Sequence, residues 1–285
     1  MTTETTARAS AERSRLVELV AGARSVLALT GAGISVPSGI PDFRTPRTGL
    51  WANVDPMKVA HIDAFNRDPV SFWRFYGERF ASLEGKQPNG AHRALVAMER
   101  AGLLDGVITQ NIDMLHRRAG TVELIEMHGS IATCSCPACG ETVELAEVRA
   151  RLAADPAGVP RCALCSGPLK PDVVLFGEML HGGTLVRARE LCERADVLLC
   201  VGSSLEVHPV AGLPLITREA GGRIAIITQG ATPLDGLADV RLGGDVVVEL
   251  AALARSLGRH DEEATEEPPH RSIPSQRMRG STNRP

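Results

Sequence analysis

Short apolar runs recur along the chain, and the segments between them carry apolar residues at helical spacing. Buried strands are predicted at residues 26–29, 107–109, 124–127, 173–175, 197–201, 223–227 and 240–242. Helices are predicted at residues 11–23, 91–101, 185–194, 210–220 and 246–257. Because strands that alternate with helices are typical of a Rossmann-like, doubly wound parallel sheet, the pattern predicts an α/β fold.

Two insertions interrupt this alternation. Residues 51–100 have a helical pattern and hold most of the aromatic side chains, and residues 134–165 hold five of the seven cysteines around a helical segment at 145–154. Both insertions follow the carboxyl ends of strands, where open α/β sheets bind ligands, so we expect them to form one small lobe over a cleft. The predicted large domain comprises residues 12–33, 107–130 and 170–257, the predicted small lobe comprises 34–106 and 131–169, and disorder is expected at 1–11 and 258–285.

The composition narrows the class of function. The chain has 285 residues and a net charge of −3, so it lacks the basic character of a nucleic-acid or membrane-surface binder, and we expect neither partner. It has no apolar run of about 18 residues and no apolar leader, which favours the cytoplasm. Seven cysteines in this context indicate a metal site or buried thiols rather than a disulfide framework.

A glycine-rich turn follows the first predicted strand. Gly31 and Gly33 flank Ala32, and residues without bulk allow a backbone to approach a phosphate closely. The dinucleotide fingerprint would place a third glycine where Val36 stands, and Pro37 argues against a long helix there. These residues alone fit both a phosphate-binding loop and a plain strand-to-loop turn.

Two Cys-x-x-Cys pairs lie in the second insertion. Cys136 and Cys139 form the first pair, Cys162 and Cys165 form the second, and 22 residues separate the pairs. Four thiolates in this pattern are typical of a tetrahedral zinc site, and four sulfur ligands leave no open position, so the predicted zinc is structural. Cys134 is an alternative to Cys136, which we prefer because a zinc knuckle has two residues between its sulfurs.

Several segments taken together resemble the sirtuins, the NAD-dependent protein lysine deacylases. The matching segments are Gly31-Ala-Gly-Ile-Ser35, Ser38-Gly-Ile-Pro-Asp-Phe-Arg44, Thr109-Gln-Asn-Ile-Asp113, His128-Gly-Ser130, the two Cys-x-x-Cys pairs, Phe176-Gly-Glu178 and Gly202-Ser-Ser204. They follow the sirtuin order and cover roughly residues 15–257. The resemblance implies a Rossmann-like domain with a small helical and zinc-ribbon lobe. It also implies NAD and zinc as cofactors, and acyl transfer from lysine in protein substrates to ADP-ribose with release of nicotinamide.

The resemblance also assigns roles to residues near the strand ends. His128 would be the general base, which suits an imidazole whose ordinary pKa lies near neutral pH. Asn111 and Asp113 would complete the catalytic set in the nicotinamide pocket, although both residue types also cap helices. Phe43 would shield the reactive ribose carbon from water. The implied cofactor-binding residues are Gly31, Ala32, Gly33, Val36, Phe43, Arg44, Gln110, Asn111, Ile112, Asp113, His128, Gly202, Ser203, Ser204, Thr228 and Val246.

Two residues depart from the usual sirtuin pattern. Ser203 stands in place of a threonine, and Thr228 stands in place of an asparagine that would bond the adenosine ribose. Threonine offers a hydroxyl where asparagine offers an amide, so the contact with adenosine is the one that changes most.

The substrate residues are also carried over from the resemblance. An acyl-lysine peptide would add as a strand between residues 174–178 and 204–207, with Val174 and Phe176 beside the lysine tunnel. Tyr76 and Arg79 form a Tyr-x-x-Arg pattern that resembles the branch that removes succinyl and malonyl groups, because arginine pairs well with a carboxylate. Alternatively, Arg79 is a solvated helix residue and Tyr76 belongs to the core of the lobe. In contrast, the segment Pro41-Asp-Phe-Arg44, with Asp42, resembles the general deacetylase branches more closely.

Two other functions fit the same scaffold. One is mono-ADP-ribosyl transfer to a protein, and the other is sensing of NAD or ADP-ribose without catalysis. The presence of His128 and Asn111 argues against a sensor. Covalent attachment of ADP-ribose to a target protein would distinguish a transferase from a deacylase.

Overall fold

The large domain is built on a six-stranded parallel sheet. The computed structural model describes residues 3–43, 45, 47, 49 and 54–265. The strand order is β3-β2-β1-β7-β8-β9, and the register places Ala28 of the central strand opposite Val107 on one side and Leu199 on the other. The strands are β1 (Val26–Thr30), β2 (Gly106–Thr109), β3 (Leu124–Glu126), β7 (Val197–Val201), β8 (Arg223–Ile227) and β9 (Val240–Leu242). The predicted doubly wound α/β sheet is therefore confirmed.

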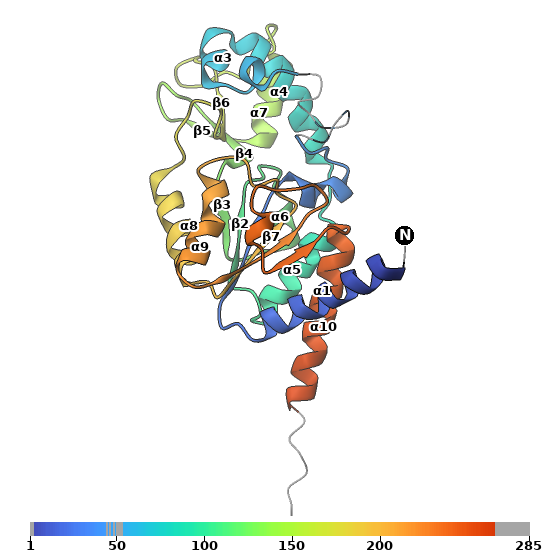
Figure 1. Ribbon diagram of the computed structural model, residues 1–285. Coiled ribbons are helices and arrows are strands. Elements are labelled where there is room, and N and C mark those ends of the chain that lie inside the picture. The colour runs from blue at the N-terminus through green and yellow to red at the C-terminus, as the bar shows by residue number, and fades with distance from the viewer. Residues whose placement is uncertain (1–2, 44, 46, 48, 50–53, 266–285) are drawn as a thin grey trace, which may run out of the picture.

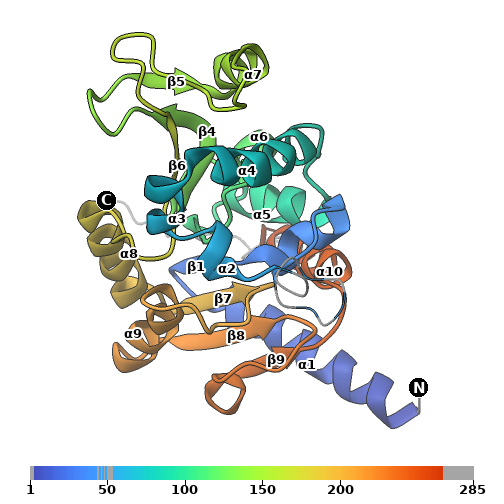
Figure 2. The same ribbon diagram turned by 90° about the horizontal axis from the view of Figure 1, so that it is seen from above.

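Helices cover both faces of this sheet (Figures 1 and 2). Alternate residues of a strand point to opposite faces, so Ala28 packs in one apolar cluster while Leu27 and Leu29 pack in another. The first cluster is covered by α1 (Thr3–Ala21), α5 (Gly90–Arg100) and α10 (Val246–Thr265). The second is covered by α8 (Gly182–Arg194), the 3-10 turn η3 (Val210–Gly212) and α9 (Leu213–Glu219).

The small lobe stands at the edge of the sheet where the parallel strands end (Figure 1). It combines a three-stranded antiparallel sheet, in the order β5-β4-β6, with helices that bury most of the aromatic side chains. The indole N–H of Trp73 donates to the carbonyl of Leu169 at 2.9 Å and so ties the helical part to the cysteine-bearing part. The elements are α2 (Pro56–Val59), α3 (Ile62–Arg67), α4 (Pro69–Glu84), β4 (Gly129–Ser135), β5 (Thr142–Glu144), α7 (Leu145–Ala154) and β6 (Lys170–Val173).

Two helix ends and the packing of two elements differ from the sequence prediction. Helix α1 begins at Thr3, within the segment for which we expected disorder. Helix α10 continues to Thr265, beyond the predicted end at residue 257, and the rest of the predicted tail lies outside the described residues. Helix α5 packs on the large sheet with α10 rather than in the small lobe. Strand β6, near the predicted strand 173–175, pairs antiparallel with β4 and does not belong to the large sheet.

Short elements complete the architecture. They are η1 (Ala32–Ser38) after β1, α6 (Leu115–Ala119) after β2, and η4 (Asp235–Leu237) before β9. Helix α5 begins with a capping box, in which the Asn89 side chain accepts the N–H of Ala91 and the His92 side chain accepts the N–H of Asn89. Among the described residues, every helix is too short or too polar to cross a lipid bilayer.

Candidate active site

A cavity of about 560 Å³ lies between the ends of β1, β2 and β3 and the small lobe. An open α/β sheet binds ligands at this edge, so the position agrees with the predicted site. The cavity is lined by these sequence-predicted residues: Ala32, Phe43, Tyr76, Arg79, Gln110, Asn111, Ile112, Asp113, His128, Val174 and Phe176.

The glycine turn packs directly on the turn after β7. The N–H of Gly33 donates to the carbonyl of Gly202 at 2.7 Å, and a Cβ on Gly33 would lie only 2.8 Å from the Cα of Gly202. Gly202 has a φ of +60°, which favours glycine, and its own Cβ would lie 2.3 Å from the backbone nitrogen of Ile34. The glycines therefore allow two strand ends to touch, and this close packing accounts for them whether or not a phosphate binds.

Gln110 connects the two turns at the sheet edge. Its side-chain amide donates to the hydroxyl of Ser203 at 2.9 Å. The Ser203 hydroxyl in turn accepts the N–H of Leu205 at 3.2 Å. Gln110 and Ser203 therefore lie together, as the predicted cofactor-binding set requires.

Asn111 and Asp113 share one partner that sequence reasoning did not assign. The hydroxyl of Ser35 donates to a carboxylate oxygen of Asp113 at 2.6 Å and accepts the side-chain amide of Asn111 at 3.2 Å. The same amide donates to the carbonyl of Gly31 at 3.1 Å. Ser35 thus holds both catalytic candidates against the glycine turn, and its place in the Gly-Ala-Gly-Ile-Ser motif was the signal available in the sequence.

Burial and hydrogen bonding act on the Asp113 carboxyl in opposite directions. Burial raises its pKa above the ordinary value, and this effect is larger than the lowering by Ser35 and by the N–H of Leu115. Asp113 is therefore placed to exchange hydrogen bonds with a polar group in the cavity, in addition to capping the start of α6 through Leu115.

His128 lies on the cavity wall just after β3, with a defined tautomer. Its Nδ1 lies 2.9 Å from the carbonyl of Gln110, and a carbonyl can only accept, so Nδ1 carries the proton. Burial lowers the pKa of His128 below its ordinary value, more than the Gln110 carbonyl raises it. The ring is therefore neutral near pH 7 and leaves Nε2 free of a proton, as a general base requires.

Arg79 and Tyr76, one helical turn apart on α4, line the same cavity. The guanidinium carbon of Arg79 lies 5.3 Å from the centre of the Phe43 ring, which is cation–π geometry. Burial lowers the pKa of Arg79, while Tyr76 and Asp113 favour its charged form. Among the described residues, the guanidinium has no hydrogen bond and no ion pair. Within the described part of the chain, a half-buried cation that makes no ion pair thus faces the cavity.

The adenosine side of the predicted site lies outside this cavity. Thr228 follows β8, and the side chain of Arg241 donates to its carbonyl at 2.7 Å. Val246 is 6% exposed and packs in the core under α10, so its side chain has a packing role. Val36 lies on η1 and is 44% exposed. The predicted residues that do not line the cavity are Gly31, Gly33, Val36, Gly202, Ser203, Ser204, Thr228 and Val246, and Arg44 lies outside the described residues.

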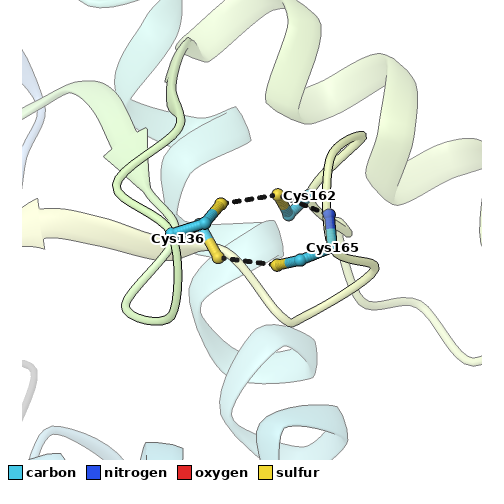
Figure 3. A group of neighbouring side chains, drawn as sticks. Cys136, Cys162 and Cys165 are labelled. Carbon is cyan, nitrogen blue, oxygen red and sulfur yellow. Dashed lines mark hydrogen bonds between the residues drawn. The ribbon is translucent and has the colours of Figure 1, made fainter.

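The four predicted zinc ligands form one cluster. Their sulfur atoms all lie within 4.8 Å of one another, with Cys136 and Cys165 3.4 Å apart and Cys139 and Cys162 3.3 Å apart. Figure 3 shows Cys136 facing Cys162 and Cys165 across the gap between the two loops. Sulfurs bound tetrahedrally to one zinc at about 2.3 Å lie about 3.8 Å apart, so the cluster fits a zinc ion with a small adjustment. Cys134, the alternative ligand, is buried outside the cluster.

Known proteins are similar to this chain in sequence. The Sir2 family model matches residues 31–209. The NAD-dependent protein deacetylase of Caldivirga maquilingensis is 46% identical over 224 residues, which are 79% of this chain and 85% of that protein. The NAD-dependent protein deacylase 1 of Archaeoglobus fulgidus is 41% identical over 244 residues, which are 85% of this chain and 97% of that protein.

Solved structures give the same assignment. A Sir2 structure with a deacetylated p53 peptide and 3'-O-acetyl ADP-ribose has a TM-score of 0.82 and 38% identity, and the match covers 86% of this chain and 98% of that one. A structure of Sir2Tm bound to a propionylated peptide has a TM-score of 0.77 and 37% identity, with 87% of this chain and 98% of that one covered. The sirtuin prediction is therefore confirmed, and the chain belongs to the Sir2 family.

Proposed function

We propose that this protein is an NAD-dependent protein lysine deacylase. The observation that carries the proposal is a single cavity that joins His128, Asn111 and Asp113 to Val174 and Phe176. The first group would act on the nicotinamide ribose, and the second would flank the acyl-lysine. A deacylase needs both sets of residues in one place, because its two substrates react with each other.

The residues of the chain divide the work as follows. NAD, when bound, supplies the ribose carbon that accepts the acyl oxygen as nicotinamide leaves. Asn111 and Asp113 orient the nicotinamide end, and Ser35 holds both of them. His128 takes a proton from a ribose hydroxyl at Nε2, because Nδ1–H is bound to the Gln110 carbonyl. Phe43 covers the cavity and excludes water from the reacting carbon.

Product analysis tests the proposal. Acetyl-, succinyl- and malonyl-lysine peptides are incubated with NAD and the full chain, and the products are identified by mass spectrometry. We expect free lysine peptide, nicotinamide and O-acyl-ADP-ribose in equal amounts. ADP-ribose attached covalently to protein, without deacylated peptide, would instead identify a mono-ADP-ribosyltransferase. Binding of NAD without turnover of any peptide would identify a sensor.

The environment of Arg79 favours acyl groups that carry a carboxylate. A buried charge without a partner is unfavourable, and a succinyl or malonyl carboxylate would neutralise this cation through a paired hydrogen bond. The Tyr76 ring is 6% exposed and lies beside Arg79 on the cavity wall, so its hydroxyl is a second donor. We propose that the enzyme removes succinyl and malonyl groups in addition to acetyl groups.

Arg79→Met tests this preference. Loss of a charged hydrogen bond of about 1.5–3 kcal/mol should raise KM for the succinyl peptide roughly tenfold or more. KM for the acetyl peptide should change little, because acetyl-lysine has no carboxylate. Arg74→Met, on the exposed face of the same helix, is the matched control and should alter neither value. Equal effects of Arg79→Met on both substrates would identify a general deacetylase in which Arg79 has only a structural role.

The setting of the reaction follows from the same residues. We propose acyl-lysine proteins as substrates. Val174 and Phe176 would contact the lysine side chain, and a strand-like contact would bind the peptide backbone. We propose the cytoplasm as its location, because a cluster of four thiols that can bind a metal suits a reducing compartment.

A further inference from the structure

Two histidines are buried behind the catalytic residues and have no role in the reaction described above. His92 on α5 is 0% exposed and His116 on α6 is 2% exposed. Their ring centroids lie 4.8 Å apart, with the ring planes at 60°. One nitrogen of each ring, Nε2 of His92 and Nδ1 of His116, is buried without a hydrogen-bond partner in the part of the chain that the structure describes.

The capping box of α5 fixes the tautomer of His92. The backbone N–H of Asn89 donates to Nδ1 of His92 at 3.4 Å, so in the neutral ring the proton resides on Nε2. The ring is neutral because burial, aided by the charge of Arg93, lowers its pKa to about 4. Nε2–H of His92 is therefore a buried donor that needs an acceptor.

Two threonines fix the tautomer of His116, which also carries its proton on Nε2. The hydroxyl of Thr30 donates its one proton to Oγ1 of Thr109 at 2.8 Å. It must therefore accept from Nε2 of His116, which lies 2.9 Å away, and the proton of that ring resides on Nε2. Burial, with His92 nearby, lowers the pKa of His116 to about 3, so this ring is neutral as well. Nδ1 of His116 is a buried acceptor that needs a donor.

We propose that Nε2–H of His92 donates to Nδ1 of His116, and that the pair positions the nicotinamide end of the active site. An unmatched buried donor beside an unmatched buried acceptor is costly, and one hydrogen bond satisfies both. Each ring nitrogen lies on the rim of its ring, so ring centroids 4.8 Å apart leave room for the two atoms to come within hydrogen-bond distance of each other.

The pair completes a chain of hydrogen bonds that ends at a catalytic residue. Thr109, at the far end from His92, accepts the backbone N–H of Asn111 at 3.1 Å. The chain therefore runs through Asn89, His92, His116, Thr30, Thr109 and Asn111.

Asn89 reaches the site by a second route. Its side-chain amide donates to the carbonyl of Ile34 at 2.8 Å and to the hydroxyl of Ser38 at 2.9 Å, both on η1. Ser35, between them, bonds Asp113. The start of helix α5 thus holds both sides of the nicotinamide pocket. Thr228, at the adenosine end, takes no part in this chain of hydrogen bonds. The inference rests on the proposed function for its catalytic consequence, and its hydrogen-bond assignment stands on geometry alone.

Histidine NMR tests the assignment without any assay of activity. Long-range ¹⁵N–¹H spectra are recorded on the full chain, and the His92→Gln variant identifies the signals of His92 by their loss. We expect both rings to be in the Nε2–H tautomer. Neither ring should titrate between about pH 6 and 8, where an exposed histidine does. A Nδ1–H tautomer for either ring, or an ordinary titration, would overturn the proposal.

Substitutions test the positioning role. His92→Leu removes the donor, His92→Gln keeps an N–H donor at a similar reach, and Met98→Leu is the matched control on the same buried helix. We expect His92→Leu to weaken inhibition by nicotinamide roughly tenfold, while ADP-ribose affinity by calorimetry stays within about twofold. His92→Gln should recover most of the loss.

Two outcomes contradict the positioning role. Equal weakening of nicotinamide and ADP-ribose binding would show a general loss of structure, and unchanged nicotinamide inhibition in His92→Leu would show that the pair does not reach the site. Failure of the wild-type chain to deacylate any peptide would refute the proposed function. That failure would leave the NMR assignment unaffected, so the two results can be told apart.

Discussion

His128 and Asp113 face the same cavity, yet burial moves their pKa values in opposite directions. Burial disfavours the charged form of each group, so it lowers the pKa of the imidazole and raises that of the carboxyl. For His128 this keeps the basic form populated, and the Gln110 carbonyl determines which nitrogen holds the proton. Burial and the Gln110 contact together therefore keep Nε2 of His128 unprotonated before any substrate binds.

His128→Ala should reduce turnover by on the order of a hundredfold or more, which is the usual contribution of a general base. The fold should persist, as measured by circular dichroism, because His128 lies on a cavity wall. His181→Ala, an exposed histidine outside the cavity, is the control and should retain full activity. In the wild type, the acidic limb of kcat/KM should lie below pH 6.5, because the pKa of His128 is lowered. Near-normal turnover in a folded His128→Ala protein would exclude the assigned role.

The sequence predicted the residues of this site better than their connections. His128, Asn111 and Asp113 were each predicted from motifs, and the structure brings all three to one cavity. Ser35 was not assigned, because a serine in a glycine-rich loop carries no sign of which partners the fold will bring to it. For Arg79, helical spacing could not decide between solvent and cavity, since that choice depends on how the lobe packs over Phe43.

At the scale of elements, strands were easier to predict than their partners. The run 223–227 was predicted with the bounds of β8, because a continuous apolar stretch between polar turns has few alternatives. Helix α5 was assigned to the wrong domain, since an apolar face does not say which of two cores will bury it. Strand β6 pairs within the small lobe because β4 provides its antiparallel partner, and that contact is invisible in the local pattern.

The cysteine cluster holds two elements of the small lobe in place, and zinc removal should therefore unfold the lobe. We expect about one zinc per chain, measured by elemental analysis, and loss of it in Cys162→Ser. Because Trp73 bonds Leu169 next to the second knuckle, its fluorescence should shift towards that of an exposed indole. Peptide turnover should be lost, while part of the far-ultraviolet circular dichroism remains, since the large sheet has its own core.

Cys192→Ala is the control for this experiment. Cys192 is buried on α8, outside the cluster, so the zinc content of the variant should equal that of the wild type. Purified active protein without zinc would contradict a structural role for the metal.

At the scale of the whole molecule, the reaction site lies where two cores meet. One core lies on the α8 and α9 face of the large sheet and the other fills the small lobe, and the cavity takes Leu185 from the edge of the first and Tyr76 from the second. Polar groups away from the cavity are buried as well, and among the described histidines His92 and His116 have the largest lowering of the pKa. This arrangement links the stability of the molecule to pH.

The free energy of unfolding should fall as the pH drops from about 7 to about 5. Unfolded histidines take up a proton near pH 6.5, whereas His92 in the native state does so only near pH 4 and His116 near pH 3. The unfolded state thus binds more protons in this window, so stability is complete above about pH 6.5 and is lost below it, by roughly 2 kcal/mol per histidine at pH 5.

Urea unfolding at a series of pH values measures the slope. His92→Gln should show a smaller slope by about one proton, because glutamine does not titrate, and identical slopes in the two proteins would mean that His92 is protonated in the native state. Carboxyls such as Asp196 and Asp235, whose pKa values are lowered, titrate below this window and do not confuse the comparison.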